Sequence, residues 1–199
     1  MNFPRIVRAI VAVISLAGLG STLCAPAFAE SISGTIAAPV PKFKANTIVY
    51  VKQGPPAPPT TKTVLLDQKG LVFVPRVLPI QKGWTVEFKN SDPVAHNVYT
   101  IDGEKYDLGT WPQGETRKHV FTKAGTYRQL CHVHDDMISF VVVLDTPWFA
   151  VSDKAGNFKL DGLPAGQYTL GVWNEKLKAA DIPVTVTAGQ PVKIEVKVQ

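Results

Sequence analysis

Cysteine and methionine are nearly absent from this chain. Its 199 residues include two cysteines and two methionines, and Met1 and Cys24 fall within the first 29 residues, which we interpret as an export signal. Cys131 and Met137 are then left alone in the mature chain, so a framework of internal disulfides is excluded. In a compartment where thiols normally pair, Cys131 is a reactive thiol, half of an intermolecular bridge, an inert buried residue or a metal ligand.

Long hydrophobic runs are also scarce. The one run of note, at residues 9–19, follows Arg5 and Arg8 and precedes the sequence Ala-Phe-Ala at residues 27–29. We therefore expect a signal peptide over residues 1–29 that is cleaved at its end, and a periplasmic or otherwise exported protein. An uncleaved membrane anchor is the alternative, but serine and glycine interrupt the run before it reaches about 20 residues. We expect no stable membrane insertion after cleavage.

The charge balance gives no sign of a nucleic-acid partner. The formal charge is +5, and loss of Arg5 and Arg8 with a signal peptide that holds no acidic residue leaves +3. No cluster of lysine and arginine with interleaved aromatic residues occurs, although nucleic-acid-binding surfaces usually carry one. We therefore expect no nucleic-acid partner.

No segment shows a convincing amphipathic helix period. Apolar and polar residues instead alternate with period two, for example at residues 84–89 and 193–198, as they do in half-buried strands. Fifteen glycines and sixteen prolines supply turns between such segments. The sequence therefore predicts an all-β protein of sandwich or barrel type.

Two changes of composition divide the mature chain. Residues 54–61, with the sequence GPPAPPTT, form a proline-rich break that cannot pair as a central strand, and we interpret them as a linker. A second change falls near Asp145, after an apolar run at residues 140–144 that is typical of a fully buried strand. All four histidines and Cys131 lie between the two breaks, so the chemistry is expected there.

The segment CHVHDDM, residues 131–137, concentrates side chains that bind metals. It carries Cys131, His134 and Met137 between two expected strands, so one tight loop turns them toward one point. Thiolate, thioether and imidazole select copper, and two histidines with one cysteine and a weak axial methionine make a blue electron-transfer site. The second imidazole must come from elsewhere, and His96 is placed for it. Zinc is the alternative metal, although a thioether is a poor fourth ligand for zinc.

The flanks of this loop resemble a known family. Upstream, VLPIQKGWTVEFKNSDPVAHNV at residues 77–98 is similar to the strand, turn and His-Asn-Val segment of plastocyanin-like cupredoxins. Downstream, FTKAGTYRQLC at residues 121–131 is similar to their approach to the ligand loop. The spacing C-x2-H-x2-M resembles that of amicyanin, and the longer arrangement resembles plastocyanin-like proteins described as methylamine-utilisation proteins. The match covers about residues 62–145.

This resemblance implies a Greek-key cupredoxin sandwich that holds one type 1 copper ion per chain. It implies His96, Cys131, His134 and Met137 as the four copper ligands, with Asn97 as the residue that ties the strand of His96 to the ligand loop. A redox protein partner, such as a dehydrogenase or a cytochrome, is implied as well.

Departures from the family pattern lie within the loop itself. Val133 stands where amicyanin and plastocyanin have proline, and His132 stands where they have serine or threonine. Asp135 and Asp136 beside His134 alter the usual apolar docking patch. The reduction potential and the partner choice of the family therefore do not transfer to this chain.

The two remaining histidines, His119 and His132, are not expected to bind a second metal. Alternation along the chain turns His132 away from the face that Cys131 uses. In multicopper oxidases, histidines on both sides of the cysteine reach a trinuclear cluster, but Leu130 precedes the cysteine here. We expect packing or solvent contact for both histidines.

The two ends of the mature chain resemble parts of one further domain. Residues 153–173 and the hairpin sequence after them are similar to the transthyretin-like sandwich of the carboxypeptidase regulatory domain, and residues 31–52 resemble its opening strands. Residues 146–199 alone offer too few strands for a sandwich of about seven. We therefore expect a small, discontinuous prealbumin- or Ig-like sandwich over residues 30–53 and 146–199, with the cupredoxin domain of residues 62–145 inserted into it. The alternative is that residues 31–52 extend the cupredoxin.

These features favour a protein that is not an enzyme. We expect an exported type 1 copper protein that carries single electrons between periplasmic redox partners. The alternative is a periplasmic copper-binding protein that stores, senses or delivers copper. A copper enzyme would need an open coordination position for its substrate, and Met137 would fill that position as the axial ligand.

Overall fold

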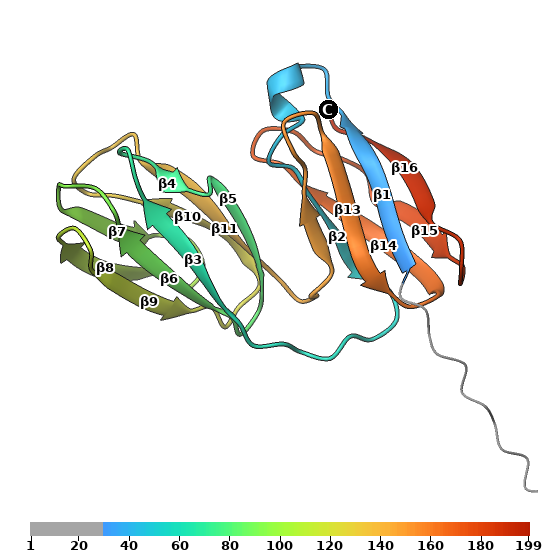
Figure 1. Cartoon of the computed structure of the whole chain (residues 1–199), viewed down its shortest axis with the longest axis horizontal. Helices are drawn as coiled ribbons and strands as arrows, with labels where there is room; N and C mark the ends of the chain where they lie inside the picture. Colours follow the sequence, from blue (N-terminus) through green and yellow to red (C-terminus); the bar gives the residue numbers. More distant parts are fainter. Residues whose placement is uncertain (1–29) are drawn as a thin grey trace, which may run out of the picture.

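The computed structural model describes residues 30–199, so the expected signal peptide and its cleavage site lie outside the described residues. This part of the chain consists of strands and one short 3-10 helix, arranged as two β-sandwiches side by side (Figure 1). The all-β fold predicted from the sequence is confirmed. Within residues 30–199, no helix has the length and apolar character needed to cross a membrane.

Strands from both ends of the described chain build one sandwich, called the terminal sandwich. They are β1 (Glu30–Ala37), β2 (Ile48–Gln53), β12 (Phe149–Val151), β13 (Asn157–Leu163), β14 (Gly166–Trp173), β15 (Ile182–Val186) and β16 (Val192–Lys197). One sheet has the order β13-β1-β16 and the other β12-β2-β14-β15. β1 pairs antiparallel with β13 and parallel with β16, while the 3-10 helix η1 (Pro41–Phe43) connects β1 to β2. The first strand is therefore hydrogen-bonded to the last.

Strands from the middle of the chain build the central sandwich. They are β3 (Thr63–Gln68), β4 (Phe73–Val74), β5 (Val77–Gln81), β6 (Thr85–Asn90), β7 (His96–Thr100), β8 (Tyr106–Trp111), β9 (Thr116–Val120), β10 (Gly125–Leu130) and β11 (Ile138–Leu144). Their two sheets have the orders β5-β11-β10-β7-β8 and β4-β3-β6-β9. Parallel pairing of β3 with β6 and of β5 with β11 makes both sheets mixed.

The core of the central sandwich follows from the period-two pattern. On β6, Val86 and Phe88 are fully buried, whereas Thr85, Glu87 and Lys89 between them are partly exposed. The strand predicted from the alternation at residues 84–89 is thus confirmed. Burying side chains of this size stabilises the fold by about 1.5–3 kcal/mol each. This core holds the two sheets together, and Cys131 and Met137 belong to it.

The proline-rich segment at residues 54–61 forms no strand and connects the two sandwiches (Figure 1). Its end is anchored to the central sandwich by Thr60. The backbone N–H of Thr60 donates to the side chain of Gln81 at 2.9 Å, and its hydroxyl accepts a hydrogen bond from the indole N–H of Trp84 at 3.0 Å. These two hydrogen bonds fix the end of the segment to β5 and to the turn before β6.

β11 is buried on both faces because it lies between the two sandwiches. Val141 and Val143 face the core of the central sandwich, whereas Phe140, Val142 and Leu144 belong to a cluster shared with the terminal sandwich. This arrangement explains the continuous apolar run at these positions, which the sequence predicted as a fully buried strand.

An aromatic contact and an ion pair add to the shared cluster. The ring of Phe140 lies 5.4 Å from that of Trp173, centroid to centroid, and the guanidinium of Arg76 pairs with Glu175 at 2.9 Å. Arg76 also donates to the backbone carbonyl of Ile138 at 3.3 Å. Since Ile138 follows Met137 directly, the contact between the sandwiches reaches the end of the predicted ligand loop.

Candidate metal centre

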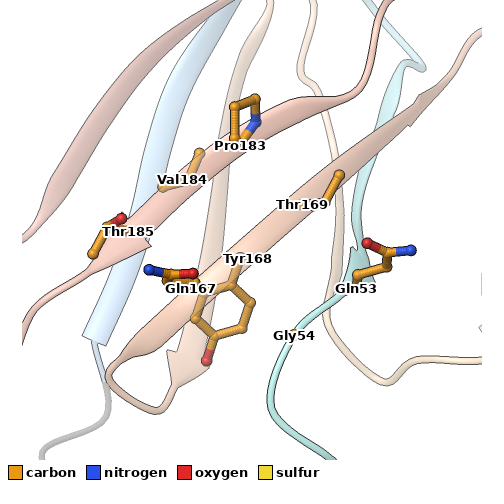
Figure 2. A pocket seen from close by; sticks show the side chains of 8 residues that line it. All are labelled: Gln53, Gly54, Gln167, Tyr168, Thr169, Pro183, Val184 and Thr185. Carbon is orange, nitrogen blue, oxygen red and sulfur yellow. The ribbon is translucent and has the colours of Figure 1, made fainter.

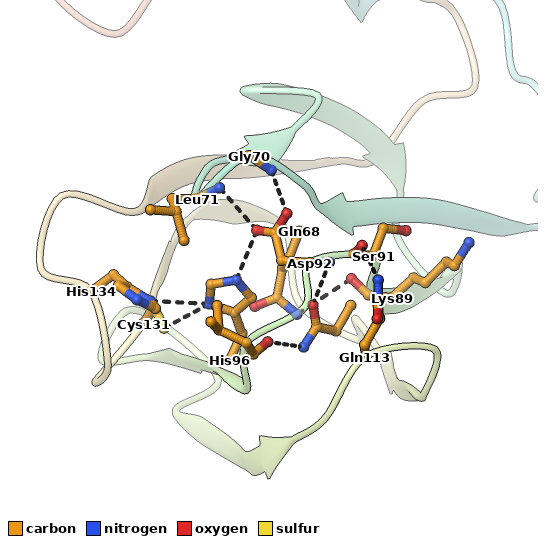
Figure 3. A network of polar contacts seen from close by, with 12 residues as sticks. Gln68, Gly70, Leu71, Lys89, Ser91, Asp92, His96, Gln113, Cys131 and His134 are labelled. Atoms are coloured by element: carbon orange, nitrogen blue, oxygen red, sulfur yellow. Dashed lines mark hydrogen bonds and ion pairs between the residues drawn. The ribbon is translucent and has the colours of Figure 1, made fainter.

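Three metal-binding side chains gather at one end of the central sandwich (Figure 3). His96 begins β7, Cys131 directly follows β10, and His134 lies in the loop between β10 and β11. The antiparallel pairing of β7 with β10 places the start of one strand near the end of the other. The ligand atoms of the three residues lie within 4.8 Å of one another. The structure thus brings together three of the four residues singled out in the sequence as copper ligands.

The donor atoms converge closely. Nδ1 of His134 lies 3.1 Å from Nδ1 of His96, and Sγ of Cys131 lies 3.9 Å from the same His96 nitrogen. His96 and Cys131 are buried, and His134 is partly exposed. Two imidazole nitrogens and a sulfur that face a common point at these separations form a donor set for a soft or borderline cation.

Met137, the fourth residue predicted as a ligand, is buried in the same apolar cluster as Cys131. Its backbone N–H donates to the carbonyl of His134 at 3.0 Å, which closes a tight turn at the end of the loop. A buried methionine in the same cluster as the cysteine fits the chemistry of copper, which accepts a thioether, better than that of zinc.

Asn97 links β7 to the ligand loop, as the sequence predicted. Its backbone N–H donates to Sγ of Cys131 at 3.4 Å, and its side-chain carbonyl accepts the N–H of His132 at 3.4 Å. Its amide nitrogen donates to Asp107 at 2.7 Å and to the carbonyl of Gly109 at 2.9 Å. The first two contacts join the strand of His96 to the cysteine and its loop, and the last two tie Asn97 to β8.

The burial of Cys131 excludes two of its four possible roles. The side chain is only 3% exposed, so its thiol is out of reach of a second chain or a bulky reagent. An intermolecular disulfide and an exposed reactive thiol are therefore wrong. The remaining choice is between an inert buried residue and a metal ligand, and the two imidazole nitrogens beside the thiol favour the ligand.

Asp92 is a residue of the site that the sequence analysis did not identify. Its carboxylate lies 2.9 Å from Nε2 of His96 and accepts the backbone N–H groups of Gly70 and Leu71 at 2.6 and 2.9 Å. Burial raises the pKa of Asp92, but these hydrogen bonds outweigh it and hold the pKa below its usual value. The sequence signal is slight, because an aspartate four residues before a histidine is commonplace in a loop.

The other two histidines lie outside the group formed by His96, Cys131 and His134. His132 is exposed, stacks on Tyr99 with ring centroids 3.7 Å apart, and contacts Asp107 through Nε2 at 3.2 Å. His119 packs on Tyr106 with centroids 4.1 Å apart, and burial lowers its pKa. Neither ring lies within the group of His96, Cys131 and His134.

The terminal sandwich carries a pocket of about 500 Å³ (Figure 2). It is lined by Gln53, Gly54, Gln167, Tyr168, Thr169, Pro183, Val184 and Thr185. None of these residues is a histidine, cysteine, methionine or carboxylate, so the pocket offers no set of metal ligands.

The central sandwich matches a known family in sequence. A family model described as copper binding proteins, plastocyanin/azurin family, matches residues 60–144. This match is confined to the central sandwich and covers less than half of the chain. The matched segment contains all four predicted ligands and both sheets of the central sandwich, whose fold is the cupredoxin sandwich expected from the sequence.

Several solved structures resemble parts of the chain. A Cu-containing nitrite reductase from Thermus scotoductus SA-01 is 30% identical with a TM-score of 0.40 over 42% of this chain, which spans 22% of that enzyme. A purple cupredoxin from Nitrosopumilus maritimus is 25% identical with a TM-score of 0.38, over 40% of this chain and 98% of its own. A reduced mutant of amicyanin is 26% identical with a TM-score of 0.39, over 41% of this chain and 82% of its own.

Proposed function

We propose that this chain is an exported type 1 copper protein that carries single electrons between periplasmic redox partners. One copper ion would be held by His96, Cys131, His134 and Met137. The observation that carries the proposal is the convergence of two imidazole nitrogens and a thiol within 4.8 Å, inside a domain of a copper-binding family. Copper bound there supplies one-electron exchange between its two common oxidation states.

Each residue of the site has a distinct part in this function. Cys131 provides the thiolate, whose charge is partly balanced by the N–H of Asn97. His96 is fully buried and fixed by Asp92, so it provides a rigid imidazole. His134 is partly exposed and offers the ring edge through which electrons enter and leave. Because the paired strands β10 and β11 anchor both ends of the loop, the ligands rearrange little between the two oxidation states, and electron exchange is fast when little moves.

The proposal also divides the whole chain into domains. We assign residues 1–29 to a cleaved signal peptide, residues 30–53 and 146–199 to a discontinuous carboxypeptidase-regulatory-like sandwich, residues 54–61 to a linker and residues 62–145 to the cupredoxin domain. The pairing of β1 with β13 and β16, and of β2 with β12 and β14, supports the discontinuous sandwich. The proposal assigns no catalytic residue, because buried Met137 would fill the axial position that a substrate would need.

Retention of copper during redox cycling tests this function. We expect the copper-loaded protein to pass through repeated reduction and oxidation without losing the metal, because His96 on β7 and the loop closed between the paired strands β10 and β11 hold the ligands in both states. Spectroelectrochemistry followed by copper analysis after desalting measures the retained fraction. If Cu(I) transfers readily to a modest chelator or to an acceptor apoprotein while electron exchange is slow, the protein delivers copper instead.

The exposed pair Asp135 and Asp136 should govern association with the redox partner. We expect electron exchange with a positively charged partner to slow as salt rises, because these carboxylates beside His134 attract a basic surface. Replacing both with asparagine should weaken the salt dependence in stopped-flow measurements and leave the copper spectrum nearly unchanged. The matched control replaces Asp161 with asparagine and Glu195 with glutamine on the terminal sandwich. An equal effect in the control would contradict docking at the loop.

Met137 should set the reduction potential without being essential for copper binding. We expect Met137→Gln to retain copper, lower the potential and alter the visible spectrum, because a harder axial oxygen stabilises Cu(II). Met137→Leu preserves the packing volume and removes the axial donor, so its potential should move in the opposite direction. Voltammetry of the three proteins measures the shifts, and complete loss of copper binding in Met137→Gln would point to a different ligand set.

A further inference from the structure

Asp92 joins two loops that meet behind His96 (Figure 3). It lies in the loop between β6 and β7, and its carboxylate reaches the turn between β3 and β4, where it accepts the N–H groups of Gly70 and Leu71. The same carboxylate lies 2.9 Å from Nε2 of His96. The carboxylate and the imidazole are both buried, at 8% and 0% side-chain exposure, so solvent screens their interaction little.

The turn that holds Asp92 has an unusual backbone. Gly70 and Leu71 both have positive φ, at 70° and 59°, and the N–H of Lys69 donates to the carbonyl of Val72 at 3.0 Å. Consecutive N–H groups that point to one side form a cradle for an anion. A leucine in the left-handed region costs about 1–2 kcal/mol. Its side chain is half exposed, so packing offsets little of this cost, whereas the bond from its N–H to Asp92 does offset it.

The contact with Asp92 determines which nitrogen of His96 carries the proton. Asp92 accepts hydrogen bonds from two backbone N–H groups, so its carboxylate faces Nε2 as an acceptor and keeps the proton there. Nδ1, which faces Cys131 and His134, is then left with a free lone pair. A carboxylate on the far nitrogen also makes an imidazole a stronger donor to a metal than a neutral partner does.

We propose that Asp92 is a positioning residue that acts on copper through His96. This inference rests on the proposed function. Asp92 fixes the ring and tautomer of His96, and its negative charge increases the electron donation of Nδ1. Cu(II), the more highly charged state, gains more from this donation than Cu(I), so Asp92 lowers the reduction potential of the site. If Asp92 only held the turn at residues 69–72 in place, replacing it would change the stability of the protein and leave the reduction potential unchanged.

The test compares Asp92→Asn with the wild-type protein in the full mature chain. We expect the variant to keep its visible copper band, to bind Cu(II) about 10- to 100-fold more weakly, and to have a higher potential. A tenfold loss confined to Cu(II) corresponds to about 59 mV for a one-electron couple. An unchanged potential in a variant that retains the copper band would overturn the proposal.

Two control variants separate the effect of the Asp92–His96 contact from the effects of bulk charge and of the strained turn. Asp135→Asn removes the same charge from an exposed position beside His134, and we expect a smaller shift because solvent screens it. Leu71→Gly keeps both N–H donors of the turn and relieves the positive φ, so its potential should match the wild type while its stability rises. If Asp135→Asn raised the reduction potential as much as Asp92→Asn, bulk charge would account for the effect and the proposal would be contradicted.

A measurement on the metal-free wild-type protein covers the case in which Asp92→Asn does not fold. Nitrogen-detected NMR of His96 should show the proton on Nε2, protected from exchange with solvent, and an unprotonated Nδ1. The proton on Nδ1, or rapid exchange at Nε2, would overturn the proposal. If the wild-type protein forms no coloured copper complex, the proposed function fails, whereas this NMR result still reports on the Asp92–His96 contact.

Discussion

Cys131→Ser should abolish the intense visible band that the Cu(II)-loaded wild-type protein is expected to show. The band arises from charge transfer between a thiolate and Cu(II), and a serine hydroxyl supplies no thiolate. Cys131 is the only cysteine among residues 30–199, so no other sulfur of this kind can replace it there. Absorption spectra of the purified mature protein, titrated with Cu(II), measure the loss.

Val133→Ala is the matched control for this prediction. Val133 lies in the same loop and is 49% exposed, so its truncation should leave the band intact and cost little stability. If the wild-type copper complex is colourless and is not reduced, the assignment of a blue copper site is wrong. That result would favour zinc at the same residues, or storage of copper in another geometry.

His96→Ala should be more damaging to copper binding than any change at the axial position. It removes a buried imidazole that we propose as a copper ligand and leaves the carboxylate of Asp92 without one of its partners. We expect Cu(II) affinity to fall by more than the roughly 10- to 100-fold that loss of an outer-shell partner costs. Competition with a chelator of known affinity measures the change, and circular dichroism checks that the variant is folded.

His132→Ala provides the contrast, because His132 is adjacent to Cys131 in sequence but stacks on Tyr99 at the surface. Its loss should leave both the copper spectrum and the Cu(II) affinity close to the wild type. If His132→Ala loses copper and His96→Ala retains it, the assignment of the second imidazole is wrong.

The strands of the central sandwich could be anticipated because a half-buried sheet imposes a period of two. Val86 and Phe88 show this on β6, where the residues between them are partly exposed. The fully apolar run at residues 140–144 predicted a buried strand, but not the reason for its burial. Only the structure shows that β11 is covered by its own core on one face and by the terminal sandwich on the other.

The loop from Cys131 to Met137 could be recognised because its chemistry is local. One tight turn between two strands carries the thiol, an imidazole and a thioether, so their spacing in the sequence already constrains their spacing in space. His96 was harder to place, since it is 35 residues from Cys131 in sequence. The resemblance of its flanks to a family, rather than the spacing, identified it.

The sequence by itself thus determined the all-β class, the strand alternation and the composition of the ligand loop, because these depend on neighbours within a few residues. Tertiary structure alone decided that Asp92 meets His96 and that Leu71 adopts a positive φ. The physical reason is that Asp92, in the loop before β7, is held by N–H groups of the separate turn between β3 and β4, and no pattern within either segment records the other. The packing of the two sheets brings the loop that contains Asp92 and the turn at residues 69–72 to the same end of the central sandwich. There the carboxylate contacts both the turn and the imidazole of His96.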